Sequence, residues 1–226
     1  MAGFETVDVS GKPVRLYAAG TLSHRAPGVL LLHAWWGLND DVVGYAERLA
    51  SAGFAVLAPD LFNGQIASTT EEAERLATTS DDTATRAIVL ASVVQLAERL
   101  GPASRLAALG FSFGAAWAIW APNKRDRIAA TVVYYGTWVE ESVLAASHVP
   151  VLGHFAEDDP YETAETVDAF EKGLKDAGRE ATIYGYPGTG HWFAEPSKEA
   201  YRAEAANLAF ERTVTFLRHE LAAPAR

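Results

Sequence analysis

Apolar strand-like segments alternate with amphipathic helix-like segments along most of the chain, and this alternation limits its fold more than any other feature. Residues 28–33 (GVLLLH) form a continuous apolar run, as in a parallel strand that is buried on both faces. Asn39 to Asp41 can cap the helix that follows, Gly53 can end it, and residues 54–58 form the next apolar run. Such alternation predicts an α/β fold with a mostly parallel, doubly wound sheet.

The same patterns predict the other elements. Strands at Glu5 to Val9 and Val14 to Ala18 flank a turn and predict an N-terminal antiparallel hairpin. Further strands are predicted at residues 106–109, 128–134, 149–155 and 181–186, and further helices within 68–82, from Asp81 or Asp82 to 100, at 115–120, from about 162 to 177 and from about 198 to 221. The chain of 226 residues has no repeat or linker, so a single domain over residues 1–226 is expected.

In the predicted helix that ends at Leu100, polar residues recur every seven positions. They are Thr85, Ser92 and Arg99, and their neighbours are mostly apolar. This spacing predicts a helix that packs on a sheet and leaves one narrow solvated stripe.

Composition excludes several classes of function. Lys and Arg number 19 against 29 Asp and Glu, a net charge of −10, so neither nucleic acid nor an anionic membrane is an expected partner. There is no signal-like N-terminus and no uninterrupted apolar window of membrane-spanning length, so a cytoplasmic protein is expected. The absence of cysteine excludes disulfides, thiolate metal sites and a cysteine nucleophile. We expect no metal or cofactor, and a monomer or weak homo-oligomer.

The most informative motif is G-F-S-F-G at residues 110–114. It lies between the strand predicted at 106–109 and the helix predicted at 115–120. A strand, a sharp turn and a helix form the setting of a nucleophile elbow, where the glycines let strand and helix approach and the serine is strained. Ser112 is therefore the candidate nucleophile. The alternative is an ordinary turn that contains a serine.

A serine nucleophile needs a histidine base and an orienting carboxylate, which follow it in this fold in the order Ser, Asp, His. Only His191 of the six histidines follows the last predicted strand on a glycine-rich loop, although a surface or capping role is the alternative. The acid is expected just after the strand at 149–155, where Glu157, Asp158 and Asp159 compete. We prefer Asp159, with Asp158 second. A plain acidic turn is the alternative.

Four segments together resemble the dienelactone hydrolase family of α/β-hydrolases, over essentially the whole chain. They are residues 32–39 (LHAWWGLN), 110–114, 153–160 (GHFAEDDP) and 186–193 (YPGTGHWF). The resemblance implies the α/β-hydrolase fold. The family's Glu-x-Asp pattern supports Asp159 as the acid. The family also implies an oxyanion hole formed by the backbone N–H groups of Trp35 and Phe113.

The chain departs from the family in two respects. Members that hydrolyse dienelactones resemble this chain but have a cysteine nucleophile and a glutamate in place of Ala34. A carboxylate there would oppose the negative charge that develops during serine attack, so Ala34 is consistent with Ser112. Four residues after His191, these enzymes have an arginine that binds the substrate carboxylate, and this chain has Glu195. Like charges about 4 Å apart cost on the order of 4 kcal/mol, so an uncharged substrate is expected.

The sequence thus predicts a serine hydrolase that cleaves small neutral carboxylic esters or lactones through an acyl-enzyme. The alternatives are a carboxymethylenebutenolidase-type dienelactone hydrolase, an acyltransferase and a non-catalytic binding protein on this scaffold. The residues expected to line the substrate pocket are Ala34, Trp36, Phe62, Trp138, Trp192 and Glu195. For each aromatic residue among them, packing beneath the loops is the alternative.

Overall fold

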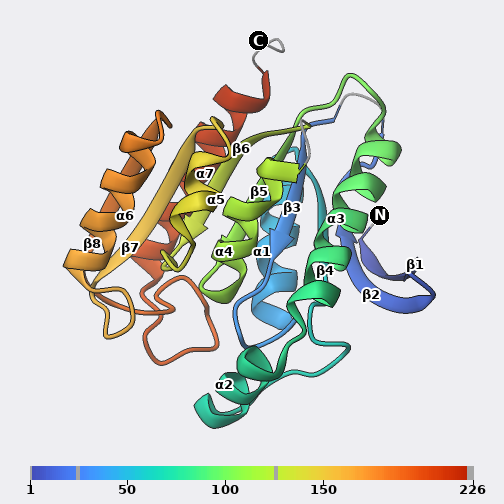
Figure 1. The fold of residues 1–226 in the computed structure, drawn as a ribbon. Helices are drawn as coiled ribbons and strands as arrows, with labels where there is room; N and C mark the ends of the chain where they lie inside the picture. Colours follow the sequence, from blue (N-terminus) through green and yellow to red (C-terminus); the bar gives the residue numbers. More distant parts are fainter. Residues whose placement is uncertain (1, 24–25, 125–126, 223–226) are drawn as a thin grey trace.

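The sheet is the centre of the molecule. The computed structural model describes residues 2–23, 26–124 and 127–222, and within them eight strands are ordered β1-β2-β4-β3-β5-β6-β7-β8 (Figure 1). The strands are β1 (Gly3–Val9), β2 (Lys12–Ala19), β3 (Gly28–Leu32), β4 (Ala55–Pro59), β5 (Leu106–Phe111), β6 (Ile128–Tyr134), β7 (Val151–Asp158) and β8 (Ala181–Gly190). Strand β2 pairs antiparallel with β1 and with β4, and every other pairing is parallel. The predicted α/β-hydrolase architecture with an N-terminal hairpin is confirmed.

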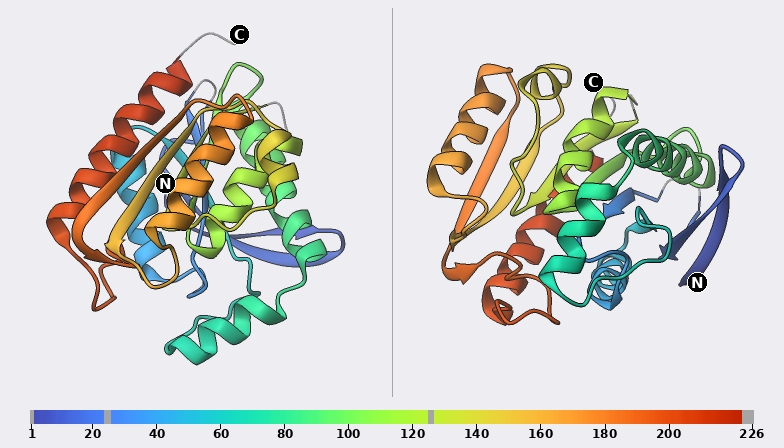
Figure 2. Two further views of the ribbon diagram at one scale, coloured as in Figure 1. Left: turned by 60° about the vertical axis from the view of Figure 1, so that its left-hand side comes forward. Right: turned by 60° about the horizontal axis from the view of Figure 1, so that its bottom comes forward.

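Helices cover both faces of this sheet. They are α1 (Asp40–Ser51), α2 (Thr70–Thr79), α3 (Asp82–Leu100), α4 (Phe113–Trp120), α5 (Glu141–Ala145), α6 (Ala164–Asp176) and α7 (Ala203–Ala222), with a 3-10 turn at Ala121–Lys124. Helices α1 and α7 lie on one face, whereas α3, α4, α5 and α6 lie on the other (Figures 1 and 2). The helix α2 and the loop between β8 and α7 lie at the lower edge in Figure 1, where parallel strands end.

Local sequence explains where α1 and α3 begin. The Asn39 side chain accepts a hydrogen bond from the Val42 amide, and the Asp81 side chain accepts from two amides in the first turn of α3. The solvated stripe predicted on α3 is wrong, because Thr85 and Ser92 are both buried. Helix α3 packs against β3, β4 and β1, so its small polar side chains lie in the contact rather than on the solvent side.

Several boundaries differ from the sequence prediction. Strand β7 begins at Val151 rather than Val149, and β8 continues to Gly190 through a segment rich in glycine and proline. Strand β8 pairs with β7 up to Tyr186 opposite Ala156 and again at Gly190 opposite Asp158, so it continues past a register shift although the residues there are typical of a loop. Residues 198–202 form a bend, a turn and an irregular segment, and α7 begins only at Ala203.

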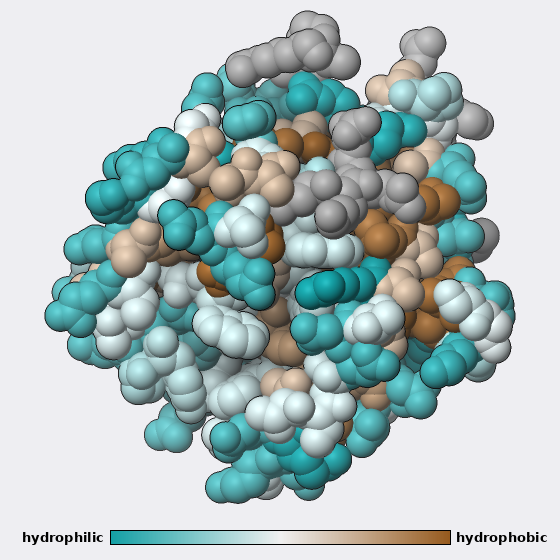
Figure 3. Space-filling view, in the orientation of Figure 1, coloured by the Kyte–Doolittle hydropathy of each residue, from teal (hydrophilic) through white to brown (hydrophobic). Residues whose placement is uncertain are grey.

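The hydrophobic core lies between the central strands and the helices on each face. Strands β3, β4 and β5 are buried along their whole length, as their uninterrupted apolar runs require. In Figure 3 hydrophilic side chains cover most of the visible face, with hydrophobic ones in separate groups between them. Among the described residues, no helix is both long enough and apolar enough to span a membrane.

Candidate active site

The elbow places Ser112 between β5 and α4 in a strained conformation, with φ 46° and ψ −112°. A Cβ at Gly110 would lie 2.1 Å from the Gly114 carbonyl oxygen, and one at Gly114 would lie 2.4 Å from the Leu32 carbonyl oxygen. Only glycine fits at either position. The predicted strand, turn and helix are therefore present, and the serine lies at the N-terminus of α4, whose first N–H groups have no partner within the helix.

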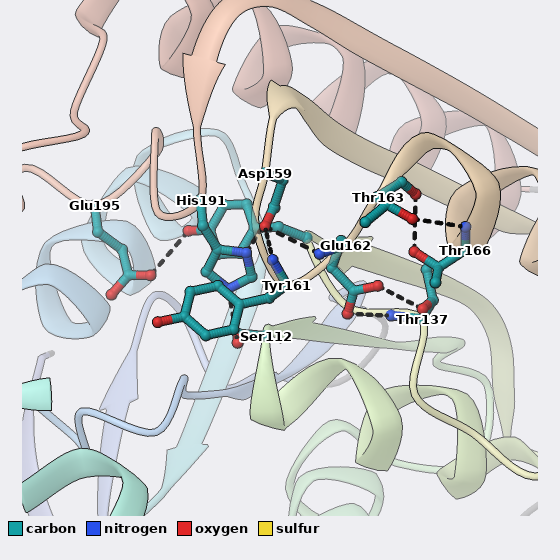
Figure 4. Close-up of polar contacts among 10 residues, drawn as sticks. Ser112, Thr137, Asp159, Tyr161, Glu162, Thr163, Thr166, His191 and Glu195 are labelled. Carbon is teal, nitrogen blue, oxygen red and sulfur yellow. Dashed lines mark hydrogen bonds and ion pairs between the residues drawn. The ribbon is translucent and has the colours of Figure 1, made fainter. Parts of the chain in front are cut away.

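A chain of two hydrogen bonds joins the serine to a histidine and an acid (Figure 4). The Ser112 Oγ is 3.0 Å from His191 Nε2, and His191 Nδ1 is 2.6 Å from Asp159 Oδ2. Because a carboxylate only accepts hydrogen bonds, Nδ1 carries the imidazole proton, and Nε2 is left to accept from the serine hydroxyl. The arrangement can therefore move a proton from the serine to the histidine.

Sheet register decides which of the three candidate acids meets the histidine. Strands β7 and β8 pair as far as Asp158 opposite Gly190, so the residues that follow, Asp159 and His191, leave the sheet side by side. Asp158 is exposed, and Glu157 accepts a hydrogen bond from the Gly188 amide 2.9 Å away. Only Asp159 among the three is buried against the imidazole.

Hydrogen bonds hold Asp159 within its own loop and hold that loop against the loop after β6. Its Oδ1 accepts hydrogen bonds from the amides of Tyr161 at 2.9 Å and Glu162 at 3.0 Å. The Glu162 carboxylate in turn accepts from the backbone amide of Thr137, at 3.0 Å, and from its hydroxyl. The loops after β6 and β7 are thereby tied together, which fixes the direction of the acid.

An aromatic cluster surrounds the histidine. The rings of Trp35 and Trp36 lie 5.8 and 5.2 Å from the Trp192 ring, and the Trp192 ring lies 4.9 Å from His191. The half-exposed Tyr161 ring contacts the His191, Trp35 and Trp192 rings at 5.0 to 5.7 Å. Tyr161 is not among the pocket residues predicted from the sequence, although it lies in a loop after a parallel strand, as the predicted tryptophans do.

The other predicted pocket residues have different surroundings. Phe62 is buried, and its ring lies 5.2 Å from that of Phe113, next to the serine. Ala34 is also buried. Trp138 is 88% exposed and has no ring contact among the described residues, so the structure does not support its place in the pocket wall. Its loop is held through the Thr137 backbone, which leaves the indole in solvent.

Glu195 corrects one electrostatic expectation. Its side chain is only 4% exposed, and Oε1 accepts a hydrogen bond from the Tyr135 hydroxyl at 2.9 Å. Burial raises the pKa of this carboxyl to about 8, so it is mainly protonated at neutral pH. The full negative charge expected from the sequence is therefore absent. The Tyr135 ring, 4.9 Å from that of His191, separates this carboxyl from the hydrogen-bonded chain.

The site brings together a hydroxyl, an imidazole acceptor, a buried carboxylate and the N-terminus of a helix. Such a set suits nucleophilic attack on a carbonyl group. Within the described part of the chain, no three His, Asp or Glu side chains are grouped closely enough to hold a metal ion.

Known proteins resemble this chain in sequence over nearly its whole length. The model of the dienelactone hydrolase family matches residues 14–221. A Bradyrhizobium protein named as a probable 2-oxo-3-(5-oxofuran-2-ylidene)propanoate lactonase is 28% identical, over 90% of this chain and 88% of its own length. Protein usf of Aquifex pyrophilus is 30% identical, over 94% of this chain and 96% of its own length.

Solved structures resemble it in fold. A dienelactone hydrolase-like promiscuous phosphotriesterase from metagenomic libraries superposes with a TM-score of 0.83, over 98% of this chain and 99% of its own length. Its sequence is 21% identical, so this likeness speaks for the fold alone.

The burial of Glu195 predicts a specific dependence of stability on pH. Because the folded-state pKa of about 8 is above the ordinary value of 4.5, the contribution of this carboxyl is complete below pH 4.5 and is lost as pH rises to about 8. The loss is at most about 1.4 kcal/mol per pH unit. Glu195→Gln keeps the acceptor for Tyr135 but does not titrate. Urea unfolding should show that the free energy of unfolding of the variant, relative to that of wild type, is higher at pH 8 than at pH 5. An unchanged difference between the two proteins would contradict the assigned burial effect.

Proposed function

Because the chain belongs to the dienelactone hydrolase family, we propose that it is a serine hydrolase that cleaves small uncharged carboxylic esters or lactones through an acyl-enzyme. The observation that carries the proposal is the hydrogen-bonded chain from Ser112 through His191 to Asp159, with distances of 3.0 and 2.6 Å. These hydrogen bonds link a hydroxyl to an imidazole acceptor and the imidazole N–H to a carboxylate, as a nucleophile, a base and an orienting acid require. A serine without such a base is a weak nucleophile at neutral pH.

In the proposed reaction, the Ser112 oxygen attacks the carbonyl carbon while His191 Nε2 takes its proton. The tetrahedral intermediate then expels the alcohol, which receives that proton from His191. A water molecule, deprotonated by His191, attacks the acyl-enzyme, and the proton returns to the serine oxygen as the carboxylic acid leaves. Asp159 accepts the Nδ1 hydrogen bond throughout and stabilises the imidazolium.

Backbone N–H groups of Phe113 and Trp35 are the proposed oxyanion hole. Phe113 is the first residue of α4, so its amide is one of the unpaired donors of that helix. Gly114 lies so close to β3 that a Cβ there would be 2.6 Å from the His33 carbonyl oxygen, which supports a position for Trp35 beside the same helix end. Loss of one such donor typically lowers kcat by about 10²- to 10³-fold.

The lining of the site supports an uncharged, apolar substrate. The rings of Trp35, Tyr161 and Trp192 form a cluster at the histidine, and the Phe62 ring packs on that of Phe113, the residue after the serine. Where dienelactone-cleaving members of the family have an arginine, Glu195 is mainly neutral and supplies no cation for a substrate carboxylate. The lactonase name of the Bradyrhizobium relative supports cyclic esters as substrates, although the lactone in that name carries a carboxylate, for which Glu195 supplies no cation.

A fluorophosphonate probe should label the native protein, because the Ser112 oxygen would displace fluoride from phosphorus. Ser112→Ala should not be labelled. The matched control is Ser142→Ala, which removes an exposed serine from α5 and should be labelled like wild type. Labelling is read by in-gel fluorescence and intact mass. Equal labelling of wild type and Ser112→Ala would falsify the assignment of the nucleophile.

The two neighbouring aspartates provide a matched test of the acid. Asp159→Asn should lower kcat for p-nitrophenyl acetate by as much as about 10⁴-fold, because the imidazole would lose the partner that holds its productive tautomer. Asp158→Asn changes an exposed residue and should alter kcat by less than about twofold. Similar, modest losses in both variants would show that neither carboxylate orients the base.

A further inference from the structure

We propose that His33 is a positioning residue that aims the Trp35 N–H at the substrate oxygen, an inference that rests on the proposed function. His33 lies just after β3, upstream of the elbow, and the mechanism above does not use it. It is fully buried. Its two ring nitrogens contact two different loops: Nδ1 is 2.7 Å from the Ala34 carbonyl oxygen, and Nε2 is 3.0 Å from the Leu61 amide nitrogen.

These contacts determine the tautomer of the ring. The Leu61 amide can only donate, so Nε2 accepts and carries no proton. The proton of the neutral imidazole is then on Nδ1, which donates to the Ala34 carbonyl. Burial lowers the pKa of His33, and a proton on Nε2 would also face the Leu61 N–H. At neutral pH, His33 is therefore uncharged, has its proton on Nδ1 and hydrogen-bonds to both loops.

The bond to Ala34 orients the next amide. The carbonyl of Ala34 and the N–H of Trp35 belong to one planar trans peptide unit, in which they point in opposite directions. A donor that holds the carbonyl therefore fixes the direction of the N–H. The Gly37 amide also donates to this carbonyl, at 3.2 Å, whereas the Trp35 N–H has no hydrogen-bond partner among the described residues. It is available for a ligand oxygen.

The bond to Leu61 ties this peptide unit to a rigid turn. Asp60 accepts hydrogen bonds from the amides of Phe62, at 2.9 Å, and Gly64, at 2.5 Å, so its buried carboxylate shapes the turn after β4. The Phe62 ring packs on the His33 ring at 4.9 Å and on the Phe113 ring at 5.2 Å. His33 thus connects the residues of both proposed oxyanion donors through one packed unit.

Two substitutions test the two hydrogen bonds of the His33 ring one at a time. In His33→Asn, the side-chain amide can occupy the place of Nδ1 and donate to the Ala34 carbonyl, but it does not reach Leu61. In His33→Gln, the amide extends to the place of Nε2 and can accept from Leu61, but it leaves the Ala34 carbonyl without this donor. Both variants bury a neutral amide, so they differ mainly in which bond remains.

Hydrolysis of p-nitrophenyl acetate tests the proposal. His33→Gln should lower kcat by at least about tenfold with KM changed less than about twofold, because a misdirected donor weakens transition-state binding. His33→Asn should retain most of kcat, and thermal unfolding shows whether both variants fold. Equal loss in the two folded variants, or wild-type kcat in His33→Gln, would overturn the proposal. If Ser112→Ala retained wild-type activity, the proposed function itself would fail, which is a distinguishable result.

The tautomer can be measured without activity. In ¹⁵N-labelled protein, the His33 ring should show a protonated Nδ1 and an unprotonated Nε2, with no titration between pH 5.5 and pH 9. This spectrum does not depend on the catalytic assignment, and it remains informative if a variant fails to fold. A proton on Nε2 would leave the His33 ring without a donor for the Ala34 carbonyl and would overturn the proposal.

Discussion

At residues 110 and 114 the chain passes so close to neighbouring backbone that neither position has room for a Cβ. This contact brings the N-terminus of α4 against the carboxyl end of β3, and it forces Ser112 into a strained conformation at the junction. The strain is sustained because the surrounding strands and helix are buried and hydrogen-bonded on both sides. Ser112, the first amide of α4 and the loop after β3 are therefore brought together by the close backbone contacts of Gly110 and Gly114.

Parallel pairing of β7 and β8 provides the rest of the site. The two strands pair up to Ala156 opposite Tyr186 and, after a register shift, again at Asp158 opposite Gly190, so Asp159 and His191 emerge next to each other. The Glu162 carboxylate then ties the loop of the acid to the loop after β6, and Tyr161 and Trp192 close around the imidazole. The geometry of the hydrogen bonds from Ser112 through His191 to Asp159 thus depends first on the pairing of β7 with β8 and then on loop contacts.

Burial changes what individual side chains can do. Glu195 was expected to present a negative charge, but it is enclosed beside Tyr135 and holds its proton to about pH 8. His33 precedes the elbow and makes no hydrogen bond with Ser112, yet its two ring nitrogens hydrogen-bond to the two loops beside the proposed oxyanion donor. Neither property could be inferred from residue type, because both depend on solvent exclusion and on partners distant in the chain.

The sequence by itself determined the α/β architecture, because the apolar period distinguishes buried strands from amphipathic helices. The motif at 110–114 with its flanks pointed to Ser112 as the candidate nucleophile, and the order of residues in the fold pointed to His191 as the candidate base. Tertiary structure alone decided the direction of side chains: it selected Asp159 over Asp158, placed Trp138 in solvent and buried Thr85 and Ser92 in a helix contact. Local sequence encodes backbone periodicity and turn chemistry, whereas the partner and solvent exposure of a side chain depend on segments that only folding brings together.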